Sequence, residues 1–455
     1  MAEKVIAAIS TPCAPGGIGV IRISGAGAIE TADRLFRPVS GEPLHSRKGY
    51  TAAFGTLWDE EGAVDDVIAT VFRGPKSYTG EDVVELSCHG GLFICRRVLR
   101  AVLKAGASPA GPGEFTKRAF LNGKLSLTEA EAVADLISAS NDQALRVARS
   151  AMKGSLYRKI RGITDKILDI SGHIAAYIDY PEEEIDPVES QDTADTLRKA
   201  EQELEALLDT FDRGQILREG VETVIVGKPN VGKSTLMNLL AGCPKSIVTD
   251  IPGTTRDVVE ETVNLDGVLL RLADTAGIRQ TQDVVERVGV DLALERLESA
   301  GLVLAVFDES VPLSEEDFSL MERLKGLPVI AVCNKADLEH KIDKKLINIK
   351  FKHIVEISAQ ENSGLDQLRS EIIKLLELDS ISPEGALLAN TRQFDCAQRA
   401  LTLLREAIVT LESGYTLDAV DVAIESVISA LLELTGEKVT DAVVDQVFSR
   451  FCVGK

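Results

Sequence analysis

The stretch Gly227-Lys-Pro-Asn-Val-Gly-Lys-Ser234 lies directly after the apolar run Thr223–Val226 and before a predicted helix. This G-x-x-x-x-G-K-S pattern is typical of a phosphate-binding loop, in which glycines let backbone N–H groups surround phosphates at a helix N-terminus. The ammonium of Lys233 would contact the β- and γ-phosphates, and the Ser234 hydroxyl would be a Mg²⁺ ligand. The stretch therefore predicts a nucleotide-binding α/β domain.

Three further motifs follow in a fixed order. Asp274-Thr275-Ala276-Gly277 ends an apolar run, so Asp274 can hold Mg²⁺ through water and the Gly277 N–H can meet the γ-phosphate. Asn334-Lys335-Ala-Asp337 follows a buried strand, and its aspartate can accept hydrogen bonds from guanine N1–H and the exocyclic amine, a pattern that adenine lacks. Ser358-Ala359 fits the last guanine-binding loop. Four ordered motifs predict that this domain binds GTP and GDP.

The segment between the first two motifs contains Thr255, which we expect to be a further Mg²⁺ ligand. The predicted nucleotide site comprises the residues of all these loops: Asn230, Val231, Gly232, Lys233, Ser234, Thr235, Thr249, Asp250, Ile251, Pro252, Gly253, Thr254, Thr255, Asp274, Thr275, Ala276, Gly277, Asn334, Lys335, Asp337, Ser358 and Ala359.

The residues that would catalyse GTP hydrolysis are less obvious than those that would bind the nucleotide. The position that carries a water-orienting glutamine in Ras-like enzymes is Ile278 here, which has no polar group. Either hydrolysis is slow or the missing groups come from elsewhere. Asn230 and the loop Thr249–Thr254 could surround a monovalent cation that replaces an arginine finger electrostatically. Glu286 could orient the attacking water, although an exposed helix carboxylate is the simpler interpretation of that residue.

Residues 1–118 differ from the nucleotide-binding block in their patterning. Short alternating runs such as Val20–Ile23 and Val67–Phe72 lie between Gly, Pro and Asp turns, which predicts strands. One helix is predicted to follow Gly90-Gly91 and to end near Ala105. We therefore expect an α+β domain over this part of the chain.

Helical periodicity dominates on both sides of the nucleotide-binding block. Thr128 and Glu131 have the spacing of a capping box, and apolar residues then recur every three or four positions over 144–178, which predicts one helix of roughly ten turns. We predict a multidomain α/β and all-α protein. In it a Ras-like P-loop G domain (218–378), with a hairpin at Asp266-Gly267, is inserted into a helical domain (119–217 and 379–455) and preceded by the α+β domain (1–118).

The composition excludes several classes of protein. The chain of 455 residues holds 50 Lys+Arg against 71 Asp+Glu, a net charge of −21, so any contact with RNA must be local or shared with a basic partner. The seven cysteines form no C-x-x-C pair, which argues against a zinc ribbon or a disulfide framework. We expect no membrane span and no signal peptide, and hence a cytoplasmic protein.

These residues, together with motifs in the flanking segments, resemble the MnmE (TrmE) family of tRNA-modification GTPases over the whole chain. The resembling motifs outside the guanine loops are Gly16–Gly25, Tyr78-Thr-Gly-Glu-Asp82, His89-Gly-Gly91, Pro112-Gly-Glu-Phe115, Arg118-Ala-Phe-Leu-Asn122 with Lys124, Val248–Asp257 and the tail Phe451-Cys-Val-Gly-Lys455. The tail is the most specific of these motifs, because other translational GTPases lack it.

The resemblance implies a homodimer joined through tetrahydrofolate-binding N-terminal domains, and G domains that meet when GTP is hydrolysed. It implies K⁺ ligands at Asn230, Thr249, Ile251 and Thr254, and a water-positioning role for Glu286. A 5-formyl- or methylene-tetrahydrofolate would contact Arg22, Glu85, Lys124 and Lys455. The family works with the FAD-dependent partner MnmG (GidA), as a heterotetramer, and adds an aminomethyl or carboxymethylaminomethyl group to carbon 5 of the wobble uridine of certain tRNAs.

Cys452 and the broader function leave alternatives open. The neighbours Arg450 and Lys455 would favour a thiolate at Cys452, and the resemblance implies a catalytic part in the modification, but a lone cysteine near a chain end is usually without such a role. A GTP-gated ribosome-assembly factor shares the guanine motifs, and a dynamin-like scaffold shares the long helices. The N-terminal domain and the Cys-x-Gly-Lys tail favour the tRNA-modifying enzyme over both.

Overall fold

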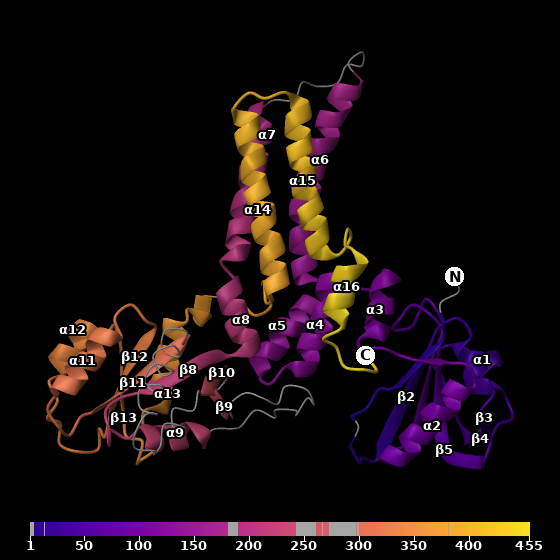
Figure 1. The fold of residues 1–455 in the computed structure, drawn as a ribbon, viewed down its shortest axis with the longest axis horizontal. Helices are drawn as coiled ribbons and strands as arrows, with labels where there is room; N and C mark the ends of the chain where they lie inside the picture. The colour runs from indigo at the N-terminus through magenta and orange to yellow at the C-terminus, as the bar shows by residue number, and fades with distance from the viewer. Residues whose placement is uncertain are drawn as a thin grey trace, which may run out of the picture. The chain divides into compact units, whose positions relative to one another are not determined.

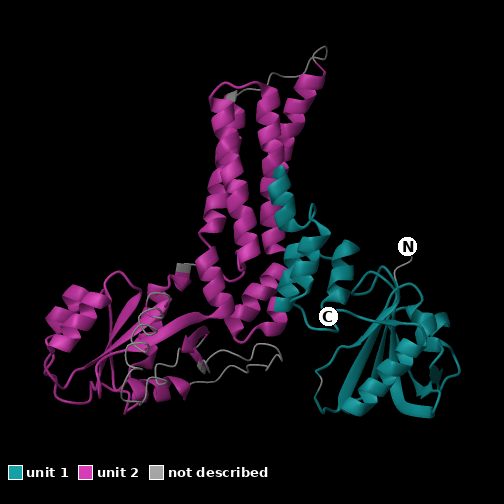
Figure 2. Ribbon diagram, in the orientation of Figure 1, with its two compact units in different colours: residues 1–134, 428–455 teal, residues 135–427 magenta. Residues whose placement is uncertain are grey.

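The computed structural model describes residues 4–12, 14–180, 190–242, 261–265, 267–272, 297, 300–380 and 382–455. The chain divides into two compact units, one of residues 1–134 and 428–455 and one of residues 135–427 (Figure 2). Within the described ranges, no helix is long and apolar enough to cross a membrane.

The first unit is built on a seven-stranded sheet of order β3-β4-β5-β6-β2-β1-β7. Its neighbours are antiparallel except for the pair β1–β7, which is parallel. The strands are β1 (Ile6–Ile9), β2 (Ile18–Ser24), β3 (Phe36–Pro38), β4 (Thr51–Asp59), β5 (Gly62–Phe72), β6 (Val83–His89) and β7 (Ser108–Pro109). The predicted strands at Val20–Ile23 and Val67–Phe72 are confirmed as parts of β2 and β5.

Helices α1 (Ala28–Asp33) and α2 (Leu92–Lys104) cover one face of this sheet (Figure 1). Val98 and Val102 of α2 are fully buried in one core with sheet residues such as Leu86. Because side chains alternate along a strand, every second residue points to the other face. That opposite face exposes 58% of Phe54 and 47% of Ile68, which are direct cross-strand partners on β4 and β5.

The rest of the first unit is helical. It contains α3 (Glu114–Leu121), the first turns of α4 (Leu127–Ser138), the end of α15 (Leu417–Thr435) and α16 (Asp441–Phe448). Leu127, Val444 and Phe448 form a small core of their own. This core brings the end of the chain to the helices that follow the sheet in sequence.

The second unit contains a six-stranded sheet of order β13-β12-β11-β8-β10-β9. All neighbours are parallel except the hairpin β9–β10. The strands are β8 (Val221–Val226), β9 (Glu261–Leu265), β10 (Val268–Leu272), β11 (Leu302–Asp308), β12 (Val329–Asn334) and β13 (His353–Ile357), and the helices are α9 (Lys233–Ala241), α11 (Glu315–Arg323), α12 (Lys344–Lys350) and α13 (Leu365–Leu375). Every residue of β11 and β12 is buried, as expected for parallel strands covered on both faces. This is the predicted Ras-like arrangement.

Long helices precede and follow this sheet in the second unit. They are α5 (Asp142–Met152), α6 (Ser155–Asp179), α7 (Ser190–Leu208), α8 (Phe211–Glu219), α14 (Thr391–Glu412) and α15 (Figure 1). Ion pairs and hydrogen bonds join neighbours: Arg405 of α14 pairs with Glu201 of α7 at 2.7 Å, and Ser171 of α6 donates to Asp421 of α15 at 2.7 Å. The G-domain sheet thus lies, in sequence, between two helical segments.

Two of the predicted helix boundaries were wrong. The capping box is formed by Ser126 and Glu129, because the Ser126 N–H donates to Glu129 Oε2 at 2.7 Å and the Glu129 N–H donates to Ser126 Oγ at 3.3 Å. Thr128 and Glu131 lie inside α4 and are buried. The single helix predicted over 144–178 is two helices, since Gly154 adopts a left-handed conformation (φ +77°) that ends α5 and begins α6. The apolar spacing continues across this break, which is why the sequence did not reveal it.

Candidate functional site

The phosphate-binding loop connects β8 to α9 and depends on its glycines. Gly227 and Gly232 have positive φ angles of +151° and +101°. A Cβ atom on Gly232 would lie 2.1 Å from Asn334 Nδ2, and one on Gly227 would lie 2.5 Å from the Val306 carbonyl oxygen. Helix α9 begins at Lys233, so its unpaired N–H groups and positive dipole end point at the loop. The loop can therefore bind an anion such as a phosphate.

Lys233 has the position expected of a phosphate-binding lysine. Its Nζ donates to the carbonyl oxygens of Gly227 at 2.6 Å and Lys228 at 2.8 Å, so the side chain lies across the loop. Burial lowers the pKa of Lys233 from its usual value, because desolvation disfavours the charged ammonium. A bound phosphate would give the Lys233 ammonium favourable electrostatic interactions in place of those with water that burial removes. Ser234 and Thr235 follow in the first turn of α9.

Asn334 joins three of the predicted loops. It ends β12, is only 3% exposed, and donates from Nδ2 to the Val231 carbonyl at 2.9 Å. Its Oδ1 accepts from the Ala359 N–H at 3.1 Å. One buried carboxamide thus connects the phosphate-binding loop with the loop after β13. The predicted phosphate and guanine motifs are brought to one edge of the sheet.

Lys335 and Asp337 follow Asn334 in the predicted guanine-binding loop. Lys335 Nζ donates to the Asn230 carbonyl at 3.1 Å and pairs with Asp308 Oδ2 at 2.5 Å. Ser358 Oγ donates to Asp337 Oδ1 at 2.5 Å, which fixes the aspartate while its other oxygen stays available as an acceptor. This arrangement fits the predicted recognition of guanine.

The sequence analysis missed Asp308, which anchors Lys335. Burial opposes the ionisation of this carboxyl, but hydrogen bonds from Lys335 and Ser310 outweigh it and lower its pKa. The available signal was a carboxylate placed at the end of the apolar run of β11. A buried acid at that position needs a cation nearby.

A second missed group lies beside the guanine-binding loop. Glu309 is fully buried, and its carboxylate contacts His340 Nδ1 at 2.9 Å and Lys344 Nζ at 3.0 Å. Lys344 also pairs with Glu356 at 2.6 Å. Glu309, His340 and Glu356 could supply three metal ligand atoms within 4.8 Å of one another. Because the Lys344 ammonium already forms an ion pair with both carboxylates, we assign no metal there.

Several predicted site residues lie outside the described residues: the loop Thr249–Thr255, the segment Asp274–Gly277 and Glu286. The K⁺ and Mg²⁺ ligands in these segments therefore stay predictions. Asn230, the other predicted K⁺ ligand, is exposed in the phosphate-binding loop with a positive φ of 63°.

A second cluster lies on the open face of the sheet in the first unit. Arg22 of β2 pairs with Glu85 of β6 at 2.8 Å, and its guanidinium lies 5.4 Å from the ring centroid of Tyr78 and 5.6 Å from that of Phe115. Burial raises the pKa of Tyr78, whose hydroxyl is 2.9 Å from Thr116 Oγ1, so this phenol stays neutral at physiological pH. The cluster offers a cation, a carboxylate and two aromatic rings.

The last five residues of the chain bind to this same domain. The N–H groups of Gly113 and Phe115 donate to the carbonyl oxygens of Cys452 at 3.2 Å and Lys455 at 3.1 Å. Lys455 is thereby attached to the residue whose ring lies beside Arg22. The side chain of Cys452 is exposed.

Lys124 lies between α3 and α4 and contacts the β5–β6 loop, which carries Tyr78. Its Nζ donates to the Pro75 carbonyl at 3.0 Å, and its Cγ lies beside Gly80. Of the four predicted folate-binding residues, Arg22 and Glu85 contact each other. Lys124 contacts the loop that carries Tyr78, and the Lys455 carbonyl accepts from the N–H of Phe115 in α3.

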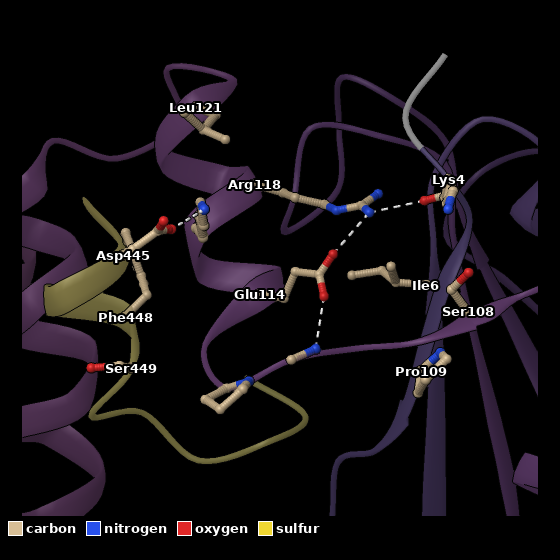
Figure 3. A pocket seen from close by; sticks show the side chains of 13 residues that line it. Lys4, Ile6, Ser108, Pro109, Glu114, Arg118, Leu121, Asp445, Phe448 and Ser449 are labelled. Carbon is tan, nitrogen blue, oxygen red and sulfur yellow. Dashed lines mark hydrogen bonds and ion pairs between the residues drawn. The ribbon is translucent and has the colours of Figure 1, made fainter. Parts of the chain in front are cut away.

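A separate cavity of about 580 Å³ lies between the β1–β7 edge and helices α3 and α16 (Figure 3). Four of the charged side chains that line it are paired within the protein: Arg118 binds Glu114, Glu81 and the Lys4 carbonyl, and Lys117 pairs with Asp445. We assign no ligand to this cavity.

The chain matches family models and curated relatives along its length. The model "MnmE helical domain" matches residues 127–452, and "GTP-binding protein TrmE N-terminus" matches residues 5–124. Proteins called tRNA modification GTPase MnmE are 41% identical in Clostridioides difficile, 42% in Bacillus subtilis and 44% in Symbiobacterium thermophilum. Each alignment covers 99–100% of both chains.

A partial likeness to a solved structure accompanies these matches. Aquifex aeolicus Era bound to GDP.AlF4- is 28% identical over 40% of this chain and 66% of its own, with a TM-score of 0.27. The full-length identity to the curated relatives shows the family: the chain belongs to the MnmE (TrmE) family of tRNA modification GTPases.

Proposed function

We propose that this protein hydrolyses GTP in a potassium-activated, dimer-dependent cycle that drives modification of carbon 5 of the wobble uridine in certain tRNAs. The partner is an FAD-dependent flavoprotein of the MnmG (GidA) type, in a heterotetramer in the cytoplasm, and a tetrahydrofolate supplies the one-carbon unit. Residues 1–118 serve folate binding and dimerisation, 218–378 form the G domain, and 119–217 with 379–455 form the helical domain.

The observation that carries this proposal is the cluster of Arg22, Glu85, Tyr78 and Phe115 with the docked C-terminal segment. A carboxylate can accept hydrogen bonds from the N–H groups of a pterin, and cations suit the carboxylates of the folate's glutamate tail. Glu85 would hold the pterin, and Lys124 and Lys455 would hold the tail. Arg22 holds Glu85 in place through the 2.8 Å ion pair. When bound, the folate supplies an activated one-carbon group.

The folate site can be tested by calorimetric titration of the full-length protein with 5-formyltetrahydrofolate. We expect Glu85→Gln to weaken binding by about tenfold or more, since it removes an ionised acceptor from a hydrogen-bonded pair. Arg100→Gln, at an exposed position of helix α2, which packs on the other face of this sheet, is the control and should bind as the wild type does. Unchanged affinity in Glu85→Gln would remove the folate assignment.

Ile278 stands at the position of the water-orienting glutamine of Ras-like enzymes, so other groups must orient the water and stabilise the developing charge. Asn230, Thr249, Ile251 and Thr254 would hold K⁺, whose charge would offset the negative charge that develops between the β- and γ-phosphates. Ser234 and Thr255 would hold Mg²⁺, and Glu286 would orient the attacking water. The exposure of Asn230 in the phosphate-binding loop supports its part in this set.

The dimer proposal is supported by the open face of the sheet in the first unit. Ile68 is the cross-strand partner of both Phe54 on β4 and Ser87 on β6. Ser87 lies two residues from Glu85 on the same strand, so the side chains of these four residues share one face of the sheet. Exposed apolar side chains beside a functional cluster favour association with a second copy. We expect the double variant Phe54→Asp/Ile68→Lys to sediment as a monomer, whereas a dimer of unchanged affinity would contradict this interface.

Cys452 would take a direct part in the modification, as the resemblance implies. Its exposed side chain and its backbone hydrogen bond to Gly113 support a thiol held beside the folate cluster. Cys452→Ser should retain folate binding and GTP turnover and lose tRNA modification. Full modification by this variant would exclude the role.

A further inference from the structure

Helix α2 is unusually basic for so acidic a chain. Its 13 residues include Arg96, Arg97, Arg100 and Lys104 and no Asp or Glu. Phe93, in the first turn, is 76% exposed although it is a large apolar residue. Phe93, Arg96 and Arg100 are spaced three and four residues apart, so they form one stripe along the helix. The buried side of α2 faces the sheet, so this stripe faces away from the folate cluster.

The cations on α2 are not equally available. Arg97 makes two hydrogen bonds to Asp59, at 2.7 and 3.0 Å, which lower the pKa of that carboxyl to about 2. Lys104 pairs with Glu60 at 2.6 Å. Arg96 and Arg100 are exposed, and no carboxylate of the described residues lies within ion-pair distance of either. The stripe therefore presents two uncompensated guanidinium groups beside an exposed aromatic ring.

A hollow of about 260 Å³ lies between this stripe and the β4–β5 turn. Phe93, Arg96 and Arg100 of the stripe line this hollow. Its other charged lining residues form ion pairs with one another: Arg97 with Asp59 and Glu61, and Lys104 with Glu60. A ligand that fits must be anionic where it meets the arginines, flat where it meets the ring, and able to donate hydrogen bonds to carboxylates. A nucleotide of RNA has all three properties, in its phosphate, base face and exocyclic amine.

We propose that the stripe Phe93–Arg96–Arg100 is an RNA-binding surface that holds the backbone of the tRNA substrate and stacks one unpaired base on Phe93. The inference rests on the proposed function, which makes tRNA the substrate. It explains how a chain of net charge −21 contacts RNA, because the contact is confined to a locally basic helix. An acidic protein would meet the arginines equally well, but it would have no use for the aromatic ring as a stacking platform.

The test measures binding of a fluorescent, unmodified tRNA transcript to the full-length dimer by anisotropy at several salt concentrations. Arg96→Gln/Arg100→Gln should weaken binding on the order of tenfold and reduce the slope of log K against log salt by about 1.5, as expected for two lost phosphate contacts. Phe93→Leu should weaken binding about tenfold, and Phe93→Tyr should bind as the wild type does, since only a ring can stack.

The matched control is Arg146→Gln/Arg149→Gln on α5, a pair that is also exposed and unpaired among the described residues. Equal losses in both double variants would mean unspecific electrostatics and would overturn the proposal. Unchanged tRNA affinity in Arg96→Gln/Arg100→Gln, loss of flavoprotein binding alone, or no tRNA binding by the wild type would also overturn it. Folate titration and GTP turnover on the same samples separate this failure from failure of the proposed function.

Discussion

Replacing Asn334 with alanine should damage the guanine nucleotide site more than any other single change to a described side chain. The substitution leaves the Val231 carbonyl and the Ala359 N–H without partners, and both residues are at least 95% buried. Each unsatisfied buried group costs about 1–3 kcal/mol, so we expect a total of about 2–6 kcal/mol for the two groups. Part of this cost lowers the free energy of unfolding. The rest weakens nucleotide binding, because the loops that would hold the base and the phosphates are no longer joined.

Titration with a fluorescent GDP analogue measures the second part. Since 1.4 kcal/mol is a factor of ten, we expect Kd to rise at least about tenfold. Asn390→Ala is the control, because Asn390 caps α14 by accepting from the Gln393 N–H at 2.9 Å. This variant should lower the free energy of unfolding by about 1 kcal/mol and leave the Kd for the GDP analogue unchanged. A Kd within twofold of the wild type in Asn334→Ala, despite lowered stability, would refute the argument that this carboxamide organises the site.

Two further predictions concern the first unit and the cysteines. Gly454→Ala should detach the C-terminal segment, because Gly454 has φ +98° and a Cβ would lie 2.3 Å from the Ile9 carbonyl oxygen. We expect a lower melting temperature and faster digestion by carboxypeptidase. No change in either quantity would contradict the docking of this segment. Among the described cysteines, iodoacetamide at pH 8 should label exposed Cys452 first. Cys88 and Cys333 should resist, because burial raises the pKa of each to about 12 and the thiolate forms only as pH approaches that value. Peptide mass mapping checks this order, and early labelling of Cys88 or Cys333 would contradict it.

The sequence could predict which loops meet at the proposed guanine site, because the geometry of each loop is local. A glycine loop between a strand and a helix fixes where backbone N–H groups point, and apolar runs fix the buried strands whose ends carry Asn334 and Asp337. The hairpin at Asp266-Gly267 was predicted for the same reason and is confirmed by the pairing of β9 with β10.

Interactions between distant residues could not be predicted in this way. The bond from Asn334 to Val231, the support of Lys335 by Asp308 and the attachment of Lys455 to Phe115 join segments that no periodicity relates. The break at Gly154 was missed because apolar spacing is the same on both sides of it. The resemblance to a family, and not the pattern, supplied the predicted folate-binding residues.

The most direct test of the account is GTP turnover in K⁺ and in Na⁺ at equal ionic strength, for the wild type and Glu286→Ala. We predict a rate in K⁺ that is larger by at least about tenfold, and that Glu286→Ala loses it while GTP binding remains. Equal rates in the two salts would contradict the cation site at Asn230 and the loop Thr249–Thr254, and with it the potassium-activated cycle proposed here.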